Sequence, residues 1–594
     1  MRGRPALAGL AFAAALAAGV AGASARDAGT ERGVAAGEGP LVYAVVIDGL
    51  DGDAVDAGSA PFISSLLAGE SARATYFTES RAIMPTVTNS NHTAMMSGAY
   101  AGDSGIAGNE FALYAPLENG DSCAATGPEN TSALPTTTSG ENRNCPQAEM
   151  VFEAVKRQGN PRGLVTAGIF GKPKLGRIFA GRNVDPDRRD VDYLWAPCAS
   201  GADDDDYCGD EPTNPITGYA VDDAAVMDEV LRTIGEGVPA NGGTARPDFT
   251  FVNLHQVDSA GHFFGRGPGY DEAVALADDE IERLVTTLRG RGDWERTVLI
   301  LLSDHSIDQV PEKVNLESVL EDAGVPAESF NAVMGDNGMA AHIYLADRES
   351  QGRFALLKAM RDALAAHPSV ADALYREPNP EDGGTRNTIA RARPDWHVEG
   401  ERSGDIFVAA KSGRIFASST GTGNLAQGHH GSNSTRDNFF AVIGGGDLVR
   451  HRTVAGNREP DFDDTAQNPK QAENVDVAAT VMGLFGMFAP EDNAGRFLKE
   501  AFEKGALSEV GAPERPRLRL RDAGKGKLTA RFLPAEGVYD LQLRDGGKWK
   551  KLLRKSDKDK LRVRGEAGEG ALFRLRTISA AGVKSDWVKA KAKF

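Results

Sequence analysis

The chain has 594 residues, a formal net charge of −18, 41% hydrophobic residues and 25% charged residues. This length exceeds what one ordinary hydrophobic core covers, so we expect two or more domains. The composition is that of a soluble globular protein. No long apolar span recurs after the first residues, which argues against a membrane-embedded chain.

The first 25 residues have the layout of a secretory signal peptide. Two arginines precede an apolar run, and Ala23, Ser24 and Ala25 close it with small side chains, so we expect cleavage near Ala25. A membrane anchor is the alternative, but the run is rich in Ala and Gly. The chain is therefore predicted to be exported, with residues 26–40 as a flexible lead-in.

Short apolar runs that end in polar residues indicate buried parallel strands. They occupy residues 41–48, 247–258 and 296–306. Helical patterns lie between and after them, as at 271–291 and 474–487. Strands that alternate with helices predict a mostly parallel α/β sheet, with working residues beyond the C-terminal ends of its strands. This places Asp48, Asp258 and Asp304 on one edge of the sheet.

Four cysteines fit an exported chain with two disulfides. Three pairings are possible, and we favour the local pairing Cys123–Cys145 with Cys198–Cys208. A zinc site is the alternative, but no CxxC spacing supports it. Residues 114–150, which contain the first two cysteines, read as a stapled insertion. The acidic stretch 201–210 could hold calcium but lacks EF-hand spacing, so a solvated turn is favoured.

The composition changes near residue 513. Residues 513–594 contain about 23 Lys and Arg against about 10 Asp and Glu, so the preceding chain is near −31. Apolar and charged residues alternate between turn signals, which predicts a small β-sandwich. The stretch RLRTISAAGVKSDW resembles the closing hairpin of a fibronectin type III domain. Its basic surface is either an ordinary solvated surface or a contact for a cell wall or another anionic surface.

Acids and histidines recur at the predicted strand ends: Asp48 in VVIDGLDGD, Asp258 and His262 in HQVDSAGH, Asp304 and His305 in LLSDHS, and His429 and His430 in HHGSNS. Each alone has a simpler explanation, such as a helix cap or a hydrogen-bonded polar group. Together, several carboxylates and imidazoles at one edge would be mutually costly without a cation between them. Mixed Asp and His ligands suit zinc or a similar divalent ion.

The order strand-D-G, P-T-x-T-x-x-N-H, D-x-x-x-H, S-D-H and H-G resembles the alkaline phosphatase superfamily, most closely its nucleotide pyrophosphatase/phosphodiesterase branch. The motifs span roughly residues 41–490. The resemblance implies a catalytic domain at 41–505 in which helices sandwich a mostly parallel sheet. It also implies two divalent metal ions, usually zinc.

Carried over by motif, the ligands of one metal are Asp48, Thr88, Asp304 and His305, and those of the other are Asp258, His262 and His430. His430 is preferred over His429 because it directly precedes Gly431. The resemblance implies that Thr88 is the nucleophile and forms a covalent phospho-threonine. It also implies that Asn109 binds a phosphoryl oxygen of the substrate. If the alignment is off by two residues, Thr86 or Ser90 takes the place of Thr88.

Three features bear on the substrate. Lys172 and Lys174 look like the Lys-x-Arg pair with which threonine-type phosphomonoesterases hold the phosphoryl group, although two surface lysines in a turn remain an equal alternative. The diesterase branch usually has a proline at the position of Ser90 and an aromatic residue at that of Asn89. The sulfatase motif C/S-x-P-x-R is absent.

The sequence therefore predicts an exported, two-metal phosphoric ester hydrolase that acts on a small phosphate ester, with the choice between monoester and diester open. One alternative is a phosphotransferase, mutase or phosphonate hydrolase of the same superfamily. Another is an inactive cell-surface binding protein. No specific nucleic-acid partner is expected, and nothing in the sequence indicates an oligomeric state.

Overall fold

The computed structural model describes residues 39–114, 123, 135–138, 145–160, 162–180, 190–197, 208–209, 222–240, 242–418, 427–454, 471–533, 537–545, 547–565 and 570–593. The predicted signal peptide, nearly all of the lead-in, most of the stapled insertion and most of the acidic stretch lie outside these residues. No helix in the described ranges combines the length and the apolarity that crossing a membrane requires.

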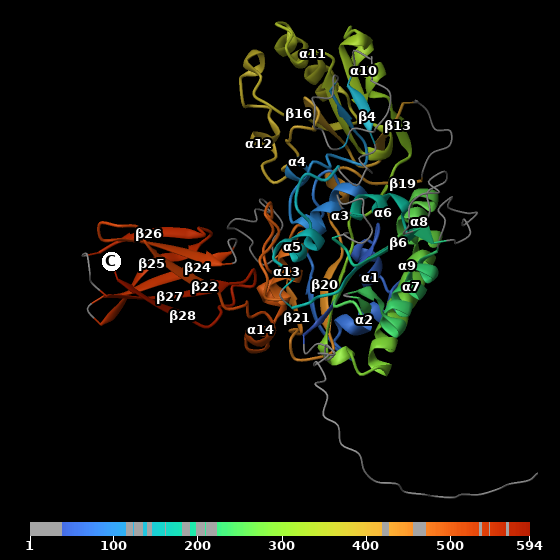
Figure 1. Ribbon diagram of the computed structural model, residues 1–594. Coiled ribbons are helices and arrows are strands. Elements are labelled where there is room, and N and C mark those ends of the chain that lie inside the picture. The colour runs from blue at the N-terminus through green and yellow to red at the C-terminus, as the bar shows by residue number, and fades with distance from the viewer. Residues whose placement is uncertain are drawn as a thin grey trace, which may run out of the picture. The chain divides into compact units, whose positions relative to one another are not determined.

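A nine-stranded sheet forms the centre of the larger α/β part (Figure 1). Its strands, in spatial order, are β21 (Arg452–Val454), β2 (Arg73–Phe77), β20 (Phe440–Gly444), β11 (Thr297–Leu302), β1 (Leu41–Ile47), β10 (Phe249–Leu254), β5 (Thr166–Phe170), β6 (Tyr193–Pro197) and β7 (Cys208–Gly209). All neighbours are parallel except at β20, which is antiparallel to β11 and to β2. The predicted mostly parallel sheet is confirmed.

Both faces of this sheet are buried, which explains why its strands are apolar throughout. In β1 every residue is buried. Val42, Ala44 and Val46 belong to one hydrophobic core, whereas Tyr43, Val45 and Ile47 belong to a second core on the opposite face. A single strand therefore contributes to two cores, and helices must cover both sides.

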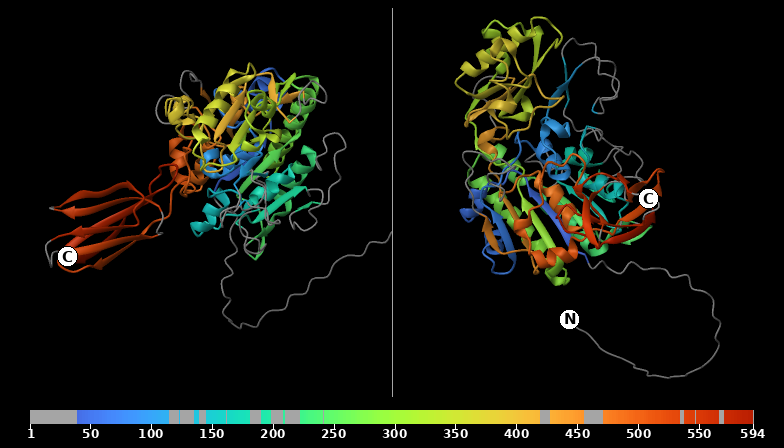
Figure 2. Two further views of the ribbon diagram at one scale, coloured as in Figure 1. Left: turned by 90° about the horizontal axis from the view of Figure 1, so that it is seen from above. Right: turned by 90° about the vertical axis from the view of Figure 1, so that its left-hand side faces the viewer.

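Helices cover the two faces of the sheet, as the views in Figure 2 also show. On the face of Val42 lie α3 (Thr88–Ser97), α5 (Val151–Arg157), α6 (Pro173–Phe179), α13 (Asp476–Leu484) and α14 (Lys504–Val510). On the face of Tyr43 lie α1 (Gly52–Asp56), α2 (Pro61–Leu67), α7 (Asp223–Glu236), α8 (Gln256–Phe264) and α9 (Pro268–Gly290). The predicted helices at 271–291 and 474–487 correspond to α9 and α13.

A second, antiparallel sheet lies in the chain between β11 and β20, and the sequence did not reveal it. Its strands are β14 (Phe330–Val333), β15 (Ala340–Leu345), β17 (Ile406–Ala410) and β16 (Val370–Tyr375). The helices α10 (Leu316–Asp322) and α11 (Arg353–Ala366) share a hydrophobic core with it. Further short elements are α4 (Ala101–Ser104), α12 (Ile389–Ala392) and the pairs β3 (Phe111–Leu113) with β4 (Thr136–Thr138), β8 (Val238–Ala240) with β9 (Gly243–Ala245), β12 (Asp308–Gln309) with β19 (Gly428–His429), and β13 (Glu312–Val314) with β18 (Arg414–Phe416).

The C-terminal residues form two antiparallel sheets, so the all-β prediction for this region is confirmed. One sheet contains β22 (Arg517–Asp522), β23 (Lys527–Leu533) and β26 (Lys560–Arg564). The other contains β25 (Lys548–Ser556), β24 (Val538–Asp545), β27 (Gly570–Ile578) and β28 (Val588–Lys593). Inward-facing side chains of both sheets, among them Phe532, Tyr539 and Phe573, make one common core. We call this region the β module.

His342 in β15 is buried between two backbone groups. One ring nitrogen, Nε2, donates to the carbonyl of Ala107 at 3.0 Å, and the other, Nδ1, accepts from the N–H of Gly404 at 3.1 Å. Burial lowers the pKa of His342 from 6.5 to about 4. The folded state therefore keeps the ring neutral at pH values at which the unfolded chain protonates it.

The stability that this neutral ring contributes is fully present above about pH 6.5 and is lost as the pH falls toward 4. Between pH 7 and pH 5 we expect the wild type to lose roughly 2 kcal/mol more unfolding free energy than a His342→Gln variant. Urea unfolding at both pH values measures this difference. Equal losses in the two proteins would contradict the prediction.

Candidate active site

Three neighbouring strands bring acidic residues to one edge of the large sheet. β1 lies between β10 and β11 and runs parallel to both. Asp48 directly follows β1, Asp304 follows β11 after one residue, and Asp258 lies in the first turn of α8, just after β10. Because the C-terminal ends of parallel strands meet at one edge, the topology alone brings these carboxylates together.

The acids and histidines form two overlapping clusters with the spacing of metal ligands. In the first, ligand atoms of Asp48, Asp304 and His305 all lie within 4.8 Å of one another, and in the second those of Asp258, His305 and His430 do. His262 joins the second cluster, since its Nε2 lies 3.3 Å from Asp258 Oδ1. Asp258 and His262 are one turn apart on α8, as the spacing D-x-x-x-H predicted.

Backbone carbonyls set the tautomers of three histidines. Nδ1 of His262 lies 3.0 Å from the carbonyl of Gly428, that of His305 3.2 Å from the carbonyl of Ser306, and that of His430 2.8 Å from the carbonyl of Thr86. A carbonyl can only accept, so each Nδ1 carries the proton and each Nε2 keeps its lone pair. Each Nε2 is also the atom that lies closest to a carboxylate oxygen. This is how metal-binding histidines are usually oriented.

His429 lacks such a defined arrangement. Its Nδ1 lies 3.0 Å from the backbone nitrogen of His430 and 3.3 Å from the carbonyl oxygen of the same residue, so these contacts do not set one tautomer. His429 lies in a group with His262 and His430 whose ligand atoms are within 4.8 Å of one another. The defined tautomer of His430 nevertheless favours His430 as the ligand of the pair.

Among the described residues, four buried ligand atoms of these clusters have no hydrogen-bond partner: Asp48 Oδ1, Asp258 Oδ1, Asp304 Oδ2 and His305 Nε2. Buried polar atoms are rarely left unsatisfied, because desolvation without a partner is costly. These four atoms converge on the same two clusters, and they are the oxygen and nitrogen donors that zinc accepts. The residues present therefore fit divalent metal ions.

Burial and neighbouring charges together decide the charges of the cluster. It lowers the pKa of His305 to about 4 and that of His430 well below its usual value, so both rings are neutral at pH 7. Burial, and then the carboxylate of Asp48, raise the pKa of Asp304. For Asp258 burial would raise the pKa, but Lys172 and then His262 outweigh it and lower the pKa well below its usual value.

Thr88 is the first residue of α3, whose ten residues are all buried. Its Oγ1 lies 3.3 Å from the ammonium of Lys172. The two alternative hydroxyls are used in backbone contacts instead. Ser90 donates to the carbonyl of Ile106 at 2.9 Å, and Thr86 accepts the N–H of Gly431 at 2.9 Å. Of the three hydroxyls, that of Thr88 is the one that faces the acidic cluster through Lys172.

The other polar side chains of this stretch hold the turn in place. Asn91 accepts the N–H of Ile83 at 2.8 Å, and His92 donates from Nδ1 to the carbonyl of Thr88 at 3.0 Å. The helix α3 starts at Thr88, so the predicted nucleophile itself occupies the helix N-terminus. Apart from the N–H of Asn89, which donates to Asn109 Oδ1, the backbone N–H groups of the first turn can bind an anion.

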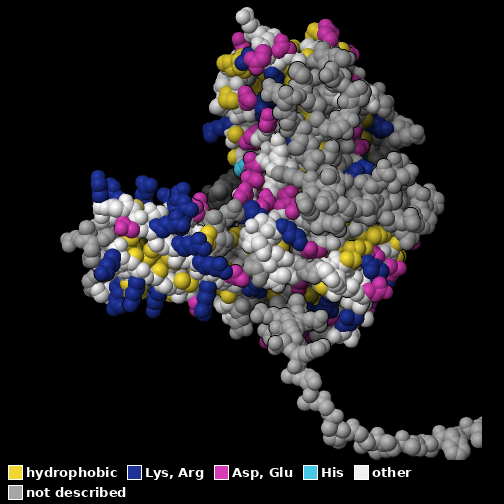
Figure 3. All heavy atoms as spheres, viewed as in Figure 1, with side chains coloured by type: hydrophobic (Ala, Val, Ile, Leu, Met, Phe, Trp, Pro, Cys, Tyr) yellow, Lys and Arg dark blue, Asp and Glu magenta, His cyan; other side chains and the backbone are white. Residues whose placement is uncertain are grey.

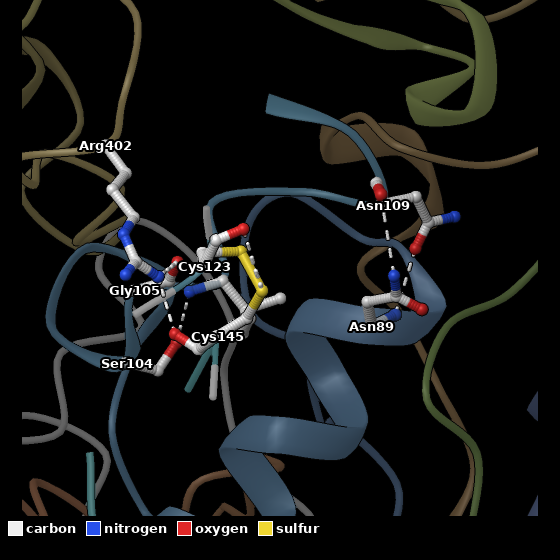
Figure 4. Close-up of a disulfide and its surroundings, with 8 residues drawn as sticks. Asn89, Ser104, Gly105, Asn109, Cys123, Cys145 and Arg402 are labelled. Carbon is white, nitrogen blue, oxygen red and sulfur yellow. Dashed lines mark hydrogen bonds between the residues drawn. A yellow bond between two sulfur atoms is a disulfide. The ribbon is translucent and has the colours of Figure 1, made fainter. Parts of the chain in front are cut away.

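Asn109 lies directly over the start of α3 (Figure 4). Its Oδ1 accepts the backbone N–H of Asn89 at 2.9 Å, and its Nδ2 donates to the carbonyl of Asp336 at 3.0 Å. The backbone contact fixes the orientation of the amide, and Nδ2 has a second hydrogen for a ligand. Asn89 Nδ2 also approaches the carbonyl of Asn109 at 3.5 Å. Asn89 and Ser90, which depart from the diesterase pattern, thus tie the 106–109 segment to the helix.

The disulfide of Figure 4 joins Cys123 to Cys145, the pairing that the sequence favoured. Arg402 donates to the carbonyls of Cys145 and Gly105 at 2.5 Å and 3.0 Å. Arg402 therefore holds Cys145, and with it the disulfide, next to Gly105 at the start of the 106–109 segment. The predicted pair Cys198–Cys208 lies outside the described residues, because Cys198 and the side chain of Cys208 are not described.

Lys172 is not a surface residue, since it is 2% exposed. Its Nζ lies 2.8 Å from Asp48 Oδ2 and 2.7 Å from Asp258 Oδ2. One ammonium thus bridges a carboxylate of each predicted metal site and reaches the hydroxyl of Thr88. Lys174 is half-buried, and burial followed by the charge of Lys172 lowers its pKa to about 8. The surface-turn alternative is therefore wrong for Lys172.

Sequence reasoning missed Asn253, the fifth residue of β10. Its amide nitrogen donates to Asp48 Oδ2 at 2.9 Å and to Nε2 of His92 at 3.0 Å. Asn253 therefore orients a predicted metal ligand and connects it to α3, the helix of the predicted nucleophile. An amide inside the otherwise apolar strand FTFVNL was the available signal.

Sheet topology and the Asp/His clusters define the class of this molecule: an α/β protein with a candidate divalent-metal centre beside a helix N-terminus. The chain belongs to the type I phosphodiesterase/nucleotide pyrophosphatase family, whose model matches residues 42–433. This family indicates a phosphoester hydrolase and confirms the predicted branch of the alkaline phosphatase superfamily. A comparison with curated proteins gave no significant match.

Among solved structures, murine ectonucleotide pyrophosphatase/phosphodiesterase 5 has a TM-score of 0.50 and 15% identity, covering 76% of this chain and 96% of its own. The human protein of the same name has a TM-score of 0.49 and 15% identity, covering 74% of this chain and 92% of its own. Phosphonoacetate hydrolase from Sinorhizobium meliloti has a TM-score of 0.48 and 17% identity, covering 74% of this chain and 94% of its own. The likeness to the murine protein shows a shared fold.

Proposed function

We propose that this chain is a two-metal phosphoric ester hydrolase that works through a covalent phospho-threonine at Thr88. The observation that carries the proposal is a set of four buried ligand atoms that, among the described residues, have no hydrogen-bond partner. These oxygen and nitrogen atoms converge on the two clusters beside Thr88. Proteins of the family are metal dependent. Zinc is the proposed metal because the donors are carboxylate oxygens and imidazole nitrogens.

In this proposal Asp48, Thr88, Asp304 and His305 hold one ion, and Asp258, His262 and His430 hold the other. The bound ions supply Lewis acidity, which lowers the pKa of the Thr88 hydroxyl and neutralises negative charge on the phosphoryl group. The chain itself supplies orientation. Backbone carbonyls keep the ring protons on Nδ1 of His262, His305 and His430.

The proposed reaction has two steps. First, Thr88 Oγ1 forms a bond to phosphorus while the bond from phosphorus to the leaving alcohol oxygen breaks, and the proton of the hydroxyl passes to solvent. Second, a water oxygen attacks phosphorus, the bond to Thr88 Oγ1 breaks, and the hydroxyl regains a proton. The Nδ2 group of Asn109 and the backbone N–H groups of the first turn of α3, apart from that of Asn89, bind phosphoryl oxygens in both steps.

Lys172 gives this site a distinctive feature, since its ammonium pairs with the carboxylates that would bind the metals. We propose that the ammonium turns to the phosphoryl group when metals are bound, and that Lys174 is a second phosphate contact. Two cations there would favour a dianionic monoester over a diester. Replacing Lys172 therefore tests the proposed preference for a monoester over a diester.

A Lys172→Gln variant is expected to bind zinc at least about 10-fold more tightly, because the competing ammonium is gone. The same variant should lose about 10- to 100-fold in p-nitrophenyl phosphate turnover, the value of a charge-assisted hydrogen bond, and less in bis-p-nitrophenyl phosphate turnover. Calorimetry measures the first effect and steady-state assays the second. Lys174→Gln is the matched control, with zinc affinity expected to change little. Unchanged monoester turnover in Lys172→Gln would remove the monoesterase argument.

The proposal as a whole is tested by assaying both esters with zinc-loaded protein and with protein kept in chelator. Turnover that needs zinc supports it. A chain that cleaves neither ester with zinc, manganese, cobalt or magnesium, and that retains no divalent metal, would instead support an inactive binding protein.

We also propose that the chain is exported by a signal peptide cleaved near Ala25, which agrees with a disulfide at Cys123–Cys145. The second disulfide, Cys198–Cys208, is part of the same proposal. A fibronectin type III relationship is proposed for the β module on the resemblance of its last hairpin, and the two antiparallel sheets around one core support it.

A further inference from the structure

The outer face of the three-stranded sheet β22–β23–β26 carries an unusual density of positive charge. Residues on these strands alternate between the core of the β module and solvent. The outward positions bear eight cations, six of them arginines: Arg517, Arg519, Arg521, Lys527, Arg531, Lys560, Arg562 and Arg564. Thr529 and Leu533 fill the remaining outward positions. We call this surface the basic face; Lys and Arg side chains gather over the β module in Figure 3.

Strand register places like charges directly opposite one another on the basic face. Arg519 pairs with Arg531, which pairs in turn with Lys560, so three cations form a row across three strands. Lys527 pairs with Arg564 in another row. Like charges directly opposite on neighbouring strands destabilise a sheet. The rows of like charges therefore lower the folding stability of the module.

Two arginines on the other sheet of the β module have polar and aromatic partners. Arg576 pairs with Asp540 at 2.6 Å, and Arg574 donates to Oε1 of Gln542 at 2.9 Å. The indole of Trp587 lies 4.3 Å from both guanidinium groups. Within the described part of the chain none of the eight cations of the basic face forms an ion pair with a carboxylate, and the same is true of Lys550, Lys589 and Lys591 on the other sheet. The basic face differs from that sheet because most of its unpaired cations are arginines.

We propose that the basic face binds a linear polyanion with phosphodiester groups in its backbone. Arginine forks bind phosphate oxygens bidentately, and arginines are the majority here. Outward residues recur about every 7 Å along a strand, and rows repeat about every 5 Å across strands, so a flexible chain can place successive phosphates over the rows. Bound phosphates would remove the repulsion between Arg519, Arg531 and Lys560.

The same face excludes two other kinds of recognition. It has no aromatic side chain at its described outward positions, so bases cannot stack there and binding reads charge without sequence. It has one large apolar side chain, the partly buried Leu533, whereas proteins that insert into membranes present an apolar surface. These two absences agree with a partner that is recognised through charges along its backbone. This inference does not depend on hydrolysis at Thr88.

The probe is a fluorescein-labelled 30-mer of deoxythymidylate, titrated with the full chain in chelator so that no metal-dependent cleavage occurs. At about 50 mM salt we expect saturable binding, with log Kd changing with log salt at a slope near 4, as for five or six neutralised phosphates. A deoxyadenylate 30-mer should bind within about 2-fold, since bases are not read.

The test variant is Arg531→Glu with Arg562→Glu, and the matched control is Lys589→Glu with Lys591→Glu on the outer face of the other sheet. Both change the charge equally. We expect the test variant to bind at least about 10-fold more weakly, with a salt slope reduced by about 1.4, and the control to stay within about 3-fold. The test variant should unfold at an equal or higher temperature, because the carboxylate introduced at position 531 would lie between the cations of Arg519 and Lys560.

If test variant and control bound the 30-mer equally weakly, the proposal would be overturned. The net charge of the module would then explain the binding without any role for the basic face. Absence of binding by the wild-type chain would do the same. Tighter binding to phosphatidylglycerol vesicles than to the 30-mer would identify a membrane surface instead. Salt-sensitive dimerisation that the test variant abolishes would identify a second copy of this chain as the partner. Hydrolysis of p-nitrophenyl phosphate remains measurable in every case, so the two proposals fail separately.

Discussion

Replacing Thr88 by alanine is expected to reduce hydrolysis of both p-nitrophenyl esters by more than about 10³-fold. The substitution removes the one hydroxyl of the turn that faces the acidic cluster, at the first residue of α3. The backbone N–H groups and the other proposed metal ligands remain, so substrate should still bind. Steady-state kinetics, with zinc content measured in the same samples, checks the result.

Two further variants make this prediction specific. Ser90→Ala removes a hydroxyl that donates to the carbonyl of Ile106, so it should cost stability and leave turnover within about 10-fold of wild type. Thr88→Ser keeps a hydroxyl and should retain more activity than the alanine variant. If Ser90→Ala were the inactive protein and Thr88→Ala the active one, the nucleophile would lie two residues further along the helix.

Replacing Asp258 by asparagine is expected to reduce the bound divalent metal from two ions to one per chain and to lower turnover about 10³-fold, since a catalytic metal contributes several kcal/mol. The change keeps the shape of the side chain but removes its charge. Asp258 Oδ1 is an unsatisfied buried oxygen, and Oδ2 pairs with Lys172. Metal analysis by mass spectrometry and ester assays measure the two effects independently.

Asp278→Asn is the matched control for this experiment. Asp278 is also buried, but its carboxylate accepts the N–H groups of Phe62 and Ile63 at the start of α2 and takes no part in the metal clusters. We expect this variant to be less stable, with metal content and turnover per folded molecule unchanged. Two metals in Asp258→Asn would show that Asp258 is not a ligand.

Local patterns in the sequence were enough to predict the strands that build the site. The apolar run at 41–48 was recognisable because β1 is buried on both faces, and a strand in that position has no polar side. The helix α9 was recognisable from its long amphipathic pattern. The four-stranded sheet between β11 and β20 was not predicted, because its short strands alternate with helices much as the main sheet does.

Lys172 illustrates why part of the site needed the fold. Its sequence context, GKPKLG, permits either a surface turn or a buried contact. Lys172 is the second residue after β5. Only the parallel pairing of β5 with β10, and of β10 with β1, brings it to the carboxylates of Asp48 and Asp258. That proximity is a long-range property, which no local pattern encodes.

The sequence by itself determined the family, the residue types of the candidate metal centre and the change of composition at the β module, because motifs, charges and periodicities are local. The tertiary structure decided which atoms face one another. It oriented the imidazoles through the carbonyls of Thr86, Ser306 and Gly428, buried Lys172 between two carboxylates, and aligned Arg519, Arg531 and Lys560 in one row. These are relations between distant segments, and packing and strand register create them.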